Sequence, residues 1–134
     1  MLTNQTSTRG QLERALSQRI QALYREQLGQ NPDKVTCQFF DEKLAIVIEN
    51  VLTASESVLI STNQQESAEQ LRLRLDDLIK PQIISVIEEI SGVHVNTLMI
   101  DRDSTWNVCG MIAMLKEAPT VRDPQTIPKL KKKD

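Results

Sequence analysis

The chain has 134 residues, of which 40% are apolar and 25% are charged, and its net charge is −2. This length and usage are typical of one globular domain that buries about two-thirds of the surface of its unfolded chain. One Trp, one Tyr and two Phe offer little stacking surface for bases. With a slightly acidic charge balance, this composition predicts no nucleic-acid partner.

The sequence gives no sign of membrane insertion or export. No apolar run approaches the ~18 residues that cross a bilayer, and the first ten residues, MLTNQTSTRG, lack the apolar core of a signal peptide. Two separated cysteines, Cys37 and Cys109, make neither a disulfide framework nor a zinc site. We therefore expect a cytoplasmic protein with both thiols in its core.

The first half of the chain predicts a helix, a hairpin and a short helix. Residues 1–7 are polar and are expected to be flexible. Thr8 and Gln11 form a capping-box pattern at the start of a helix that Gly29 ends. Residues 35–40, with Val35, Cys37 and Phe39 on one side, and residues 44–48, apolar on both sides, predict two strands. A second capping box, Thr53 with Glu56, predicts a short helix over residues 53–61.

The stretch 67–92 predicts one long amphipathic helix. It begins at a third capping pattern, Ser67 with Gln70, contains Pro81 as a kink, and ends at Gly92. One apolar stripe contains Leu71, Leu75, Leu78, Ile79, Val86 and Ile90. A second apolar group lies roughly opposite and contains Leu73, Ile84 and Ile87. Because a helix on a domain surface needs only one apolar face, the second group indicates burial on both sides or a partner.

The second half of the chain repeats the order of the first. Residues 93–100 and 105–115 predict two strands around a turn at 101–104, with Gly110 as a candidate bulge. The fold class is therefore α+β, in the order α-β-β-(short α)-α-β-β, with a four-stranded antiparallel sheet and two long helices on one face. The single domain covers residues 8–116. Prolines and lysines after residue 116 predict a disordered basic tail over 117–134.

Several residues in this order and spacing carry a resemblance to a known family. They are Arg9, Gly10, Tyr24, Gly29, Pro32, Leu52, Thr53, Glu56, Arg74, Pro81, Gly92 and Asp101. The pattern resembles the MpsC-like family of small bacterial proteins over residues 9–116. The resemblance implies a link to a sodium-dependent membrane-potential or inorganic-carbon uptake system. Where the family tends to have Gly-Arg-Gly-Pro after the first helix, this chain has Gln30 and Asn31 between Gly29 and Pro32. If that arginine holds an anion in relatives, this chain lacks it.

Residue patterns that carry chemistry are scarce. His94 is the only histidine, so it cannot complete a metal set with others of its kind. The four glycines form no phosphate-binding loop, and no Gly-x-Ser-x-Gly elbow occurs. We therefore assign no catalytic, cofactor-binding or metal-binding residue and expect a protein that is not an enzyme.

The leading functional hypothesis is a non-catalytic, oligomeric interaction or regulatory module, most simply a homodimer. The second and fourth strands are apolar on both faces, whereas a sheet with one solvent face should alternate apolar and polar residues. The expected interface residues are Leu73, Ile84, Ile87, Val47, Met111 and Ala113. The alternative within one chain is that the short helix covers the second face of the sheet.

A small-ligand or anion sensor is the second hypothesis. Its candidate residues are Arg9, Arg72 and Arg74, because guanidinium groups suit anions. The tail carries Lys129 and Lys131 to Lys133, which suit an anionic membrane surface or an acidic protein partner.

Overall fold

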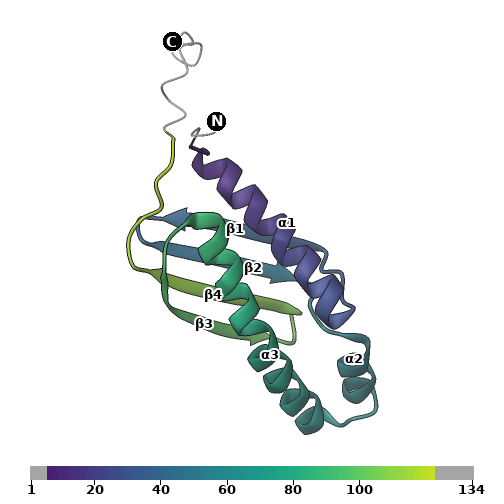
Figure 1. Ribbon diagram of the computed structural model, residues 1–134. Helices are drawn as coiled ribbons and strands as arrows, with labels where there is room; N and C mark the ends of the chain where they lie inside the picture. The colour runs from purple at the N-terminus through teal and green to yellow at the C-terminus, as the bar shows by residue number, and fades with distance from the viewer. Residues whose placement is uncertain (1–5, 123–134) are drawn as a thin grey trace.

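A computed structural model describes residues 6–122 and shows a four-stranded antiparallel sheet with two long helices on one face (Figure 1). The elements follow the order α1 (Arg9–Leu28), β1 (Lys34–Phe40), β2 (Lys43–Glu49), α2 (Ala54–Ser61), α3 (Gln65–Ser91), β3 (Val95–Asp103) and β4 (Val108–Leu115). This arrangement confirms the predicted α+β class and the order of its elements. The predicted flexible start of the chain at 1–5 and the lysine tail at 123–134 lie outside the described residues.

Helix α1 begins and ends where its sequence predicts. The hydroxyl of Thr8 accepts from the Gln11 backbone N–H at 3.2 Å, and the Gln11 side chain accepts from the Thr8 N–H at 2.8 Å. Gly29 closes the helix in the left-handed conformation, with φ of 65°, where a side chain would be strained. The buried face of α1 contains Leu16, Ile20 and Tyr24.

The sheet consists of two hairpins joined side by side in the order β1-β2-β4-β3. Both inner strands, β2 and β4, pair along their length, with Ala45 opposite Ile112. The irregularity in pairing lies between Val95 and Thr97 in β3, so the predicted bulge at Gly110 is wrong. The turn between β3 and β4 also falls later than predicted, which leaves Trp106 outside the strands and 80% exposed.

Helix α3 starts at Gln65, two residues before the predicted start. Its N-cap is Gln64, which makes no capping bond with its side chain, so the predicted capping box at Ser67 is wrong. The reason is the tight connection from α2, where Asn63 adopts a left-handed conformation and the Gln64 N–H donates to the Leu59 carbonyl at 2.8 Å. As predicted, Pro81 lies within the helix, and Gly92 closes it in the left-handed conformation.

One layer of apolar side chains fills the space between the sheet and the two long helices. From the sheet it contains Val35, Cys37, Phe39, Leu44, Ile46, Ile48, Val95, Leu98, Cys109, Met111, Ala113 and Leu115. From the helices it contains Leu16, Ile20, Tyr24, Ile79, Ile83, Val86 and Ile87. The buried stripe of α3 is therefore rotated from the predicted one, and Leu78 is 56% exposed. Stripe position depends on where the sheet lies, which periodicity alone does not fix.

Helix α2 does not cover the second face of the sheet. It packs against the N-terminal half of α3, beyond the end of the strands, as Figure 1 shows. The alternative in which the short helix shields the sheet is therefore wrong. Among residues 6–122, no helix lies on the face of the sheet opposite α1 and α3.

The segment 117–122, which the sequence assigned to the tail, packs against the start of α1. Pro119 is buried, and the Arg122 N–H donates to the Ser7 carbonyl at 2.9 Å. The described part of the chain thus ends beside its own beginning (Figure 1).

Candidate functional site

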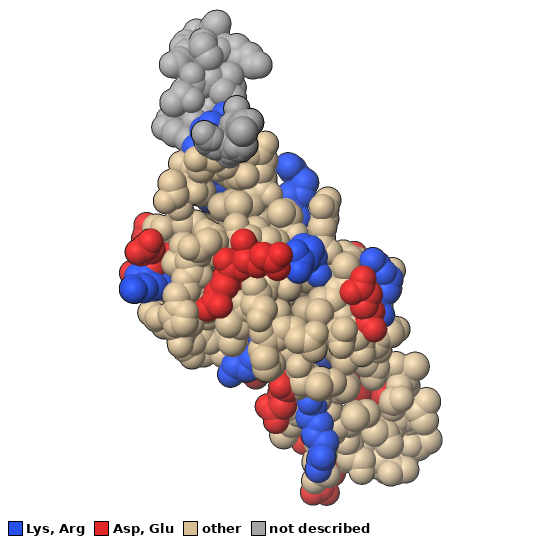
Figure 2. All heavy atoms as spheres, viewed as in Figure 1, with Lys and Arg blue, Asp and Glu red and all other residues tan. Residues whose placement is uncertain are grey.

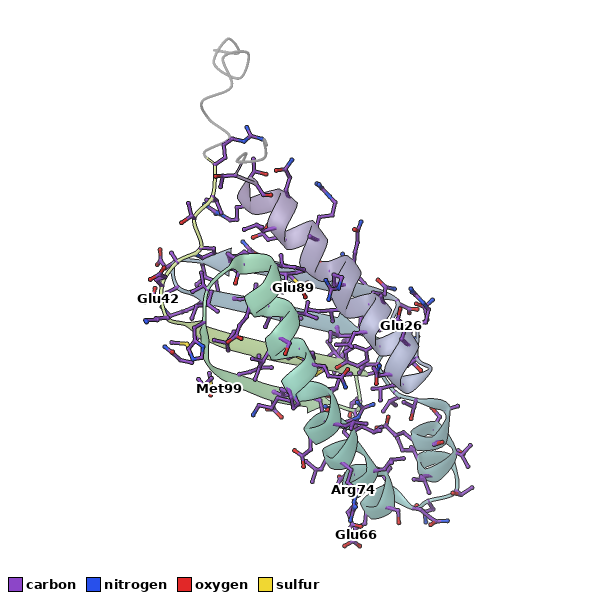
Figure 3. The ribbon with its side chains drawn as sticks, in the orientation of Figure 1. Glu26, Glu42, Glu66, Arg74, Glu89 and Met99 are labelled. Carbon is purple, nitrogen blue, oxygen red and sulfur yellow. The ribbon has the colours of Figure 1, made fainter. Side chains whose placement is uncertain are left out.

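The face of the sheet turned away from the helices is apolar at its centre. Alternation along the strands places Ala45 and Val47 of β2 and Ile112 and Met114 of β4 on this face. Phe40 of β1 is 45% exposed and Met99 of β3 is 52% exposed. Figure 3 labels Met99 on the edge strand β3. We call this set of outward-facing strand residues the uncovered face.

Strand register brings these side chains into rows. One row across the four strands is Gln38, Ala45, Ile112 and Met99. The next row is Thr36, Val47, Gly110 and Asp101. Directly opposed residues on one face lie about 5 Å apart, which places Ala45 beside Ile112 at the centre of the face. The uncovered face therefore has an apolar centre flanked by more polar edge strands.

The edges of the uncovered face carry charges of opposite sign. Lys34 lies on β1, directly across from Glu49 of β2, whereas Asp101 and Asp103 lie on β3 at the opposite edge. All four residues are exposed. This pattern of apolar centre and charged rim is typical of protein interfaces.

The six residues expected at an interface do not form one surface. Met111, Ala113 and Ile87 are at most 2% exposed, and they lie in the layer between the sheet and the helices, where Ile84 packs against them. Leu73 is 63% exposed but belongs to the N-terminal half of α3. Only Val47, 39% exposed, lies on the uncovered face. The face assignment in β4 is thus corrected by one residue, from Met111 and Ala113 to Ile112 and Met114.

A cleft of about 550 Å³ lies at the far end of the molecule, between α2, the N-terminal half of α3 and the end of β3. Its lining is Leu52, Glu56, Ile60, Gln65, Ala68, Glu69, Arg72, Leu73, Asp76, Ile100, Asp101, Arg102, Ser104 and Thr105. Asn107, in the turn before β4, connects this turn to the segment before α2. Its side-chain oxygen accepts from the N–H groups of Val51 and Leu52.

The floor of the cleft is a buried ion pair between α2 and α3. Glu56 is 1% exposed and Arg72 is 3% exposed. The Arg72 guanidinium donates to Glu56 Oε2 at 2.6 Å, to Glu56 Oε1, and to the Val51 carbonyl at 3.0 Å. The Thr53 hydroxyl donates to Glu56 Oε1 at 3.0 Å. The capping box predicted from Thr53 and Glu56 therefore also holds the arginine that joins the two helices.

Asp76 extends this pair toward the sheet. Its carboxylate accepts from Arg102 of β3 and lies 3.6 Å from Arg72 Nη1. The buried Tyr24 hydroxyl lies near the same charges, and burial raises the pKa of this phenol well above its ordinary range. Two carboxylates and two guanidinium groups balance, so the network formed by Glu56, Arg72, Asp76 and Arg102 is neutral.

The three arginines of the anion hypothesis lie apart. Arg9 is exposed at the start of α1. Arg74 is exposed in the N-terminal half of α3, at the other end of the molecule (Figure 3). Arg72 is buried and bound to Glu56. The sequence analysis missed Arg102, although its position offers a signal. It occupies an inward place in β3 after Leu98 and Ile100, where an unpaired charge would be costly.

The two cysteines and the histidine lie in positions that are typical of structural residues. Burial raises the pKa of both the Cys37 and the Cys109 thiols to about 11. His94 is exposed and its ring lies 3.1 Å from the Glu88 carboxylate. Within the part of the chain that the structure describes, no group of three metal-binding side chains occurs. In the same part, no helix is both long and apolar enough to cross a membrane.

A comparison with models of known protein families matches the chain to one family. The family described as "Na+-translocating membrane potential-generating system (MpsC)" matches residues 8–117. No curated protein and no solved structure matches the chain significantly.

Proposed function

The chain belongs to the MpsC family, and on that premise we propose that it is a non-catalytic module that self-associates through the uncovered face of its sheet. The family description names a Na+-translocating system that generates a membrane potential. We propose that the dimer acts as an interaction or regulatory part of such a system.

The observation that supports this proposal most is the apolar centre of the uncovered face. Val47, Ile112, Met114 and Met99 stand side by side there, with no covering helix among the described residues. Contiguous apolar surface of this kind is uncommon on monomers and usually belongs to an interface. Two such faces packed together would form a β-sandwich core about 10 Å thick.

The charged residues of the face find opposite charges under either two-fold arrangement. If the two-fold axis runs parallel to the strands, β1 of one copy lies over β3 of the other. Lys34 then faces Asp103 of the second copy, and this contact occurs twice by symmetry. A two-fold axis across the strands would instead place β2 over β2 and bring Glu49 of each copy over Lys43 of the other, so charge does not decide between the two arrangements.

The size of the face predicts a dimer of moderate affinity. Four strands spaced ~4.8 Å apart and about seven residues long at ~3.3 Å per residue cover roughly 440 Å² per copy. Two copies would bury about 900 Å², which lies below the ~1,200 Å² of the smaller stable interfaces. We therefore expect a dissociation constant in the micromolar range.

Native mass spectrometry of the purified protein tests this function directly. A dimer without any retained small molecule supports the interaction module. A monomer that retains a small anion would instead support the sensor. The sensor has less support, because the Arg72 guanidinium is already occupied by Glu56 and the Val51 carbonyl.

A further inference from the structure

The cleft at the far end of the molecule combines apolar walls with an acidic rim. Ile60, Ala68 and Ile100 line its walls, and the exposed Leu73 lies at its edge. Figure 2 shows that the surface over α2 is nearly free of charged side chains. The exposed Trp106 lies one residue beyond the lining residue Thr105.

The charge of the rim follows from the charges that remain after pairing. The inner network of Glu56, Arg72, Asp76 and Arg102 is neutral, as described above. The two other carboxylates of the lining, Glu69 and Asp101, are exposed, and neither forms an ion pair within residues 6–122. The cleft therefore favours a ligand with positive charges around an apolar group, and it disfavours an anionic membrane surface.

We propose that this cleft binds the lysine-rich C-terminal segment of a second copy of the chain. The segment IPKLKKKD at residues 127–134 places Leu130 between Lys129 and Lys131, followed by two more lysines. Leu130 enters the apolar part of the cleft, and the flanking lysines face Glu69 and Asp101. This interface lies at the far end of the molecule and shares only Asp101 with the edge of the uncovered face, whereas Glu69 of α3 lies outside that face.

The second copy is required because the segment cannot reach the cleft of its own chain. Arg122 lies beside Thr8 at the start of α1, whereas the cleft lies past the opposite end of that helix (Figure 1). The 20 residues of α1 span about 30 Å. Eight residues from Arg122 to Leu130 span at most about 29 Å when fully extended, before any detour around the helix. Leu130 therefore reaches only the cleft of another molecule.

The single tryptophan provides the measurement. The receptor is the full chain carrying Lys129→Glu, Lys131→Glu, Lys132→Glu and Lys133→Glu, so that its own segment does not compete. A synthetic peptide of residues 125–134, which contains no tryptophan, is titrated into it while Trp106 fluorescence is recorded. We expect saturable binding that weakens as salt is raised.

Charge reversal locates the site. Glu69→Lys in the receptor should weaken peptide binding about five- to tenfold, and a peptide with Lys131→Glu should recover part of that loss. The matched control is Glu26→Lys, an exposed position on α1 that does not line the cleft (Figure 3), which should change little.

Two results would overturn the proposal. One is the absence of saturable binding at millimolar peptide, and the other is an equal effect of Glu69→Lys and Glu26→Lys. Binding of the peptide to phosphatidylserine vesicles but not to the receptor would overturn it in favour of a membrane role. Because Ile112→Lys disrupts only the uncovered face, peptide binding by that variant separates failure of this proposal from failure of the sheet dimer.

Discussion

The two faces of the sheet differ less in composition than in what lies on them. On the covered face, β2 contributes Leu44, Ile46 and Ile48, each with 0% exposure beneath the helices. On the uncovered face, the same strand contributes Ala45 and Val47, and no described helix packs there. The inner strands thus carry apolar residues on both faces, as strands buried on both sides do.

The edge strand β1 shows where the two faces differ in residue composition. On β1 the covered face contains Val35, Cys37 and Phe39, whereas Thr36 and Gln38 point outward. A face with an apolar centre and polar edges is suited to a partner of limited size, and not to solvent alone. Helices α1 and α3 complete the core on the covered face, whereas the apolar centre of the second face is the surface through which we propose self-association.

The largest expected effect comes from a charge introduced at Met111, which faces the core, whereas its neighbour Ile112 lies on the uncovered face. Met111→Lys should lower the free energy of unfolding by about 4 kcal/mol or more, because it buries an unpaired ammonium group in the core. Urea unfolding followed by circular dichroism measures this loss. A folded, stable Met111→Lys protein would contradict the assignment of the two faces.

A second destabilising change removes one partner of the buried ion pair, which lies outside both faces of the sheet. Arg72→Met leaves the Glu56 carboxylate buried without its partner, so we expect a loss of about 3 kcal/mol in the free energy of unfolding. The double variant Glu56→Leu with Arg72→Met should be more stable than Arg72→Met, because no charge is then left unpaired. Both variants should keep the self-association of the folded fraction. Equal stability of single and double variants would argue against the buried pair.

Thiol reactivity distinguishes the faces kinetically. With the pKa of Cys37 and Cys109 raised from 9.0 to about 11, the thiolate fraction at pH 8 falls roughly a hundredfold. A cysteine introduced at Ala45 on the uncovered face should react at an ordinary rate in dilute solution, while the native thiols react only when the protein opens. Fast labelling of the native thiols, followed by mass spectrometry, would contradict their burial.

The same thiols predict a dependence of stability on pH. The unfolded chain releases these protons near pH 9 and the folded chain near pH 11, so the folded state binds more protons between these values. Stability should therefore fall as pH rises from 9 to 11. Replacing Cys109 with Ser should reduce this slope in urea unfolding at several pH values.

The smallest expected effect enlarges the apolar centre. Gln38 lies on the uncovered face beside Ala45, so Gln38→Val should tighten dimerisation about three- to fivefold by adding apolar area. Gln18→Val, at an exposed position of α1 on the other side of the sheet, is the matched control and should leave the dissociation constant unchanged. Weaker association of Gln38→Val would place the interface elsewhere.

The helix ends and the sheet were predictable because their signals are local. Thr8 with Gln11, Thr53 with Glu56, and the two glycines at helix ends each act within one turn of the chain. The start of α3 was not predictable from Ser67, because a tight connection from α2 overrides a capping pattern. The choice of face in β4 was equally open, since Met111 and Ile112 are both apolar and only tertiary packing decides between them.

The candidate sites depended on contacts that are distant in sequence. Glu56 and Arg72 are 16 residues apart, and Asp76 meets Arg102 across 26 residues. Arg72 was predicted as a candidate for anion binding, whereas the structure pairs it with Glu56, a partner that spacing could not indicate. The existence of a second apolar face was predictable, because two strands carry apolar residues on both sides. Which residues belong to that face follows only from the strand register.

Sedimentation velocity over a range of concentrations, comparing the unmodified protein with Ile112→Lys, tests the central claim most directly. The account predicts a monomer–dimer equilibrium with a micromolar dissociation constant for the unmodified protein. It predicts a folded monomer for Ile112→Lys, with the melting temperature that the unmodified protein shows below its dissociation constant. A monomer at every concentration for the unmodified protein, or a dimer that Ile112→Lys leaves intact, would contradict the assignment of the uncovered face as the interface.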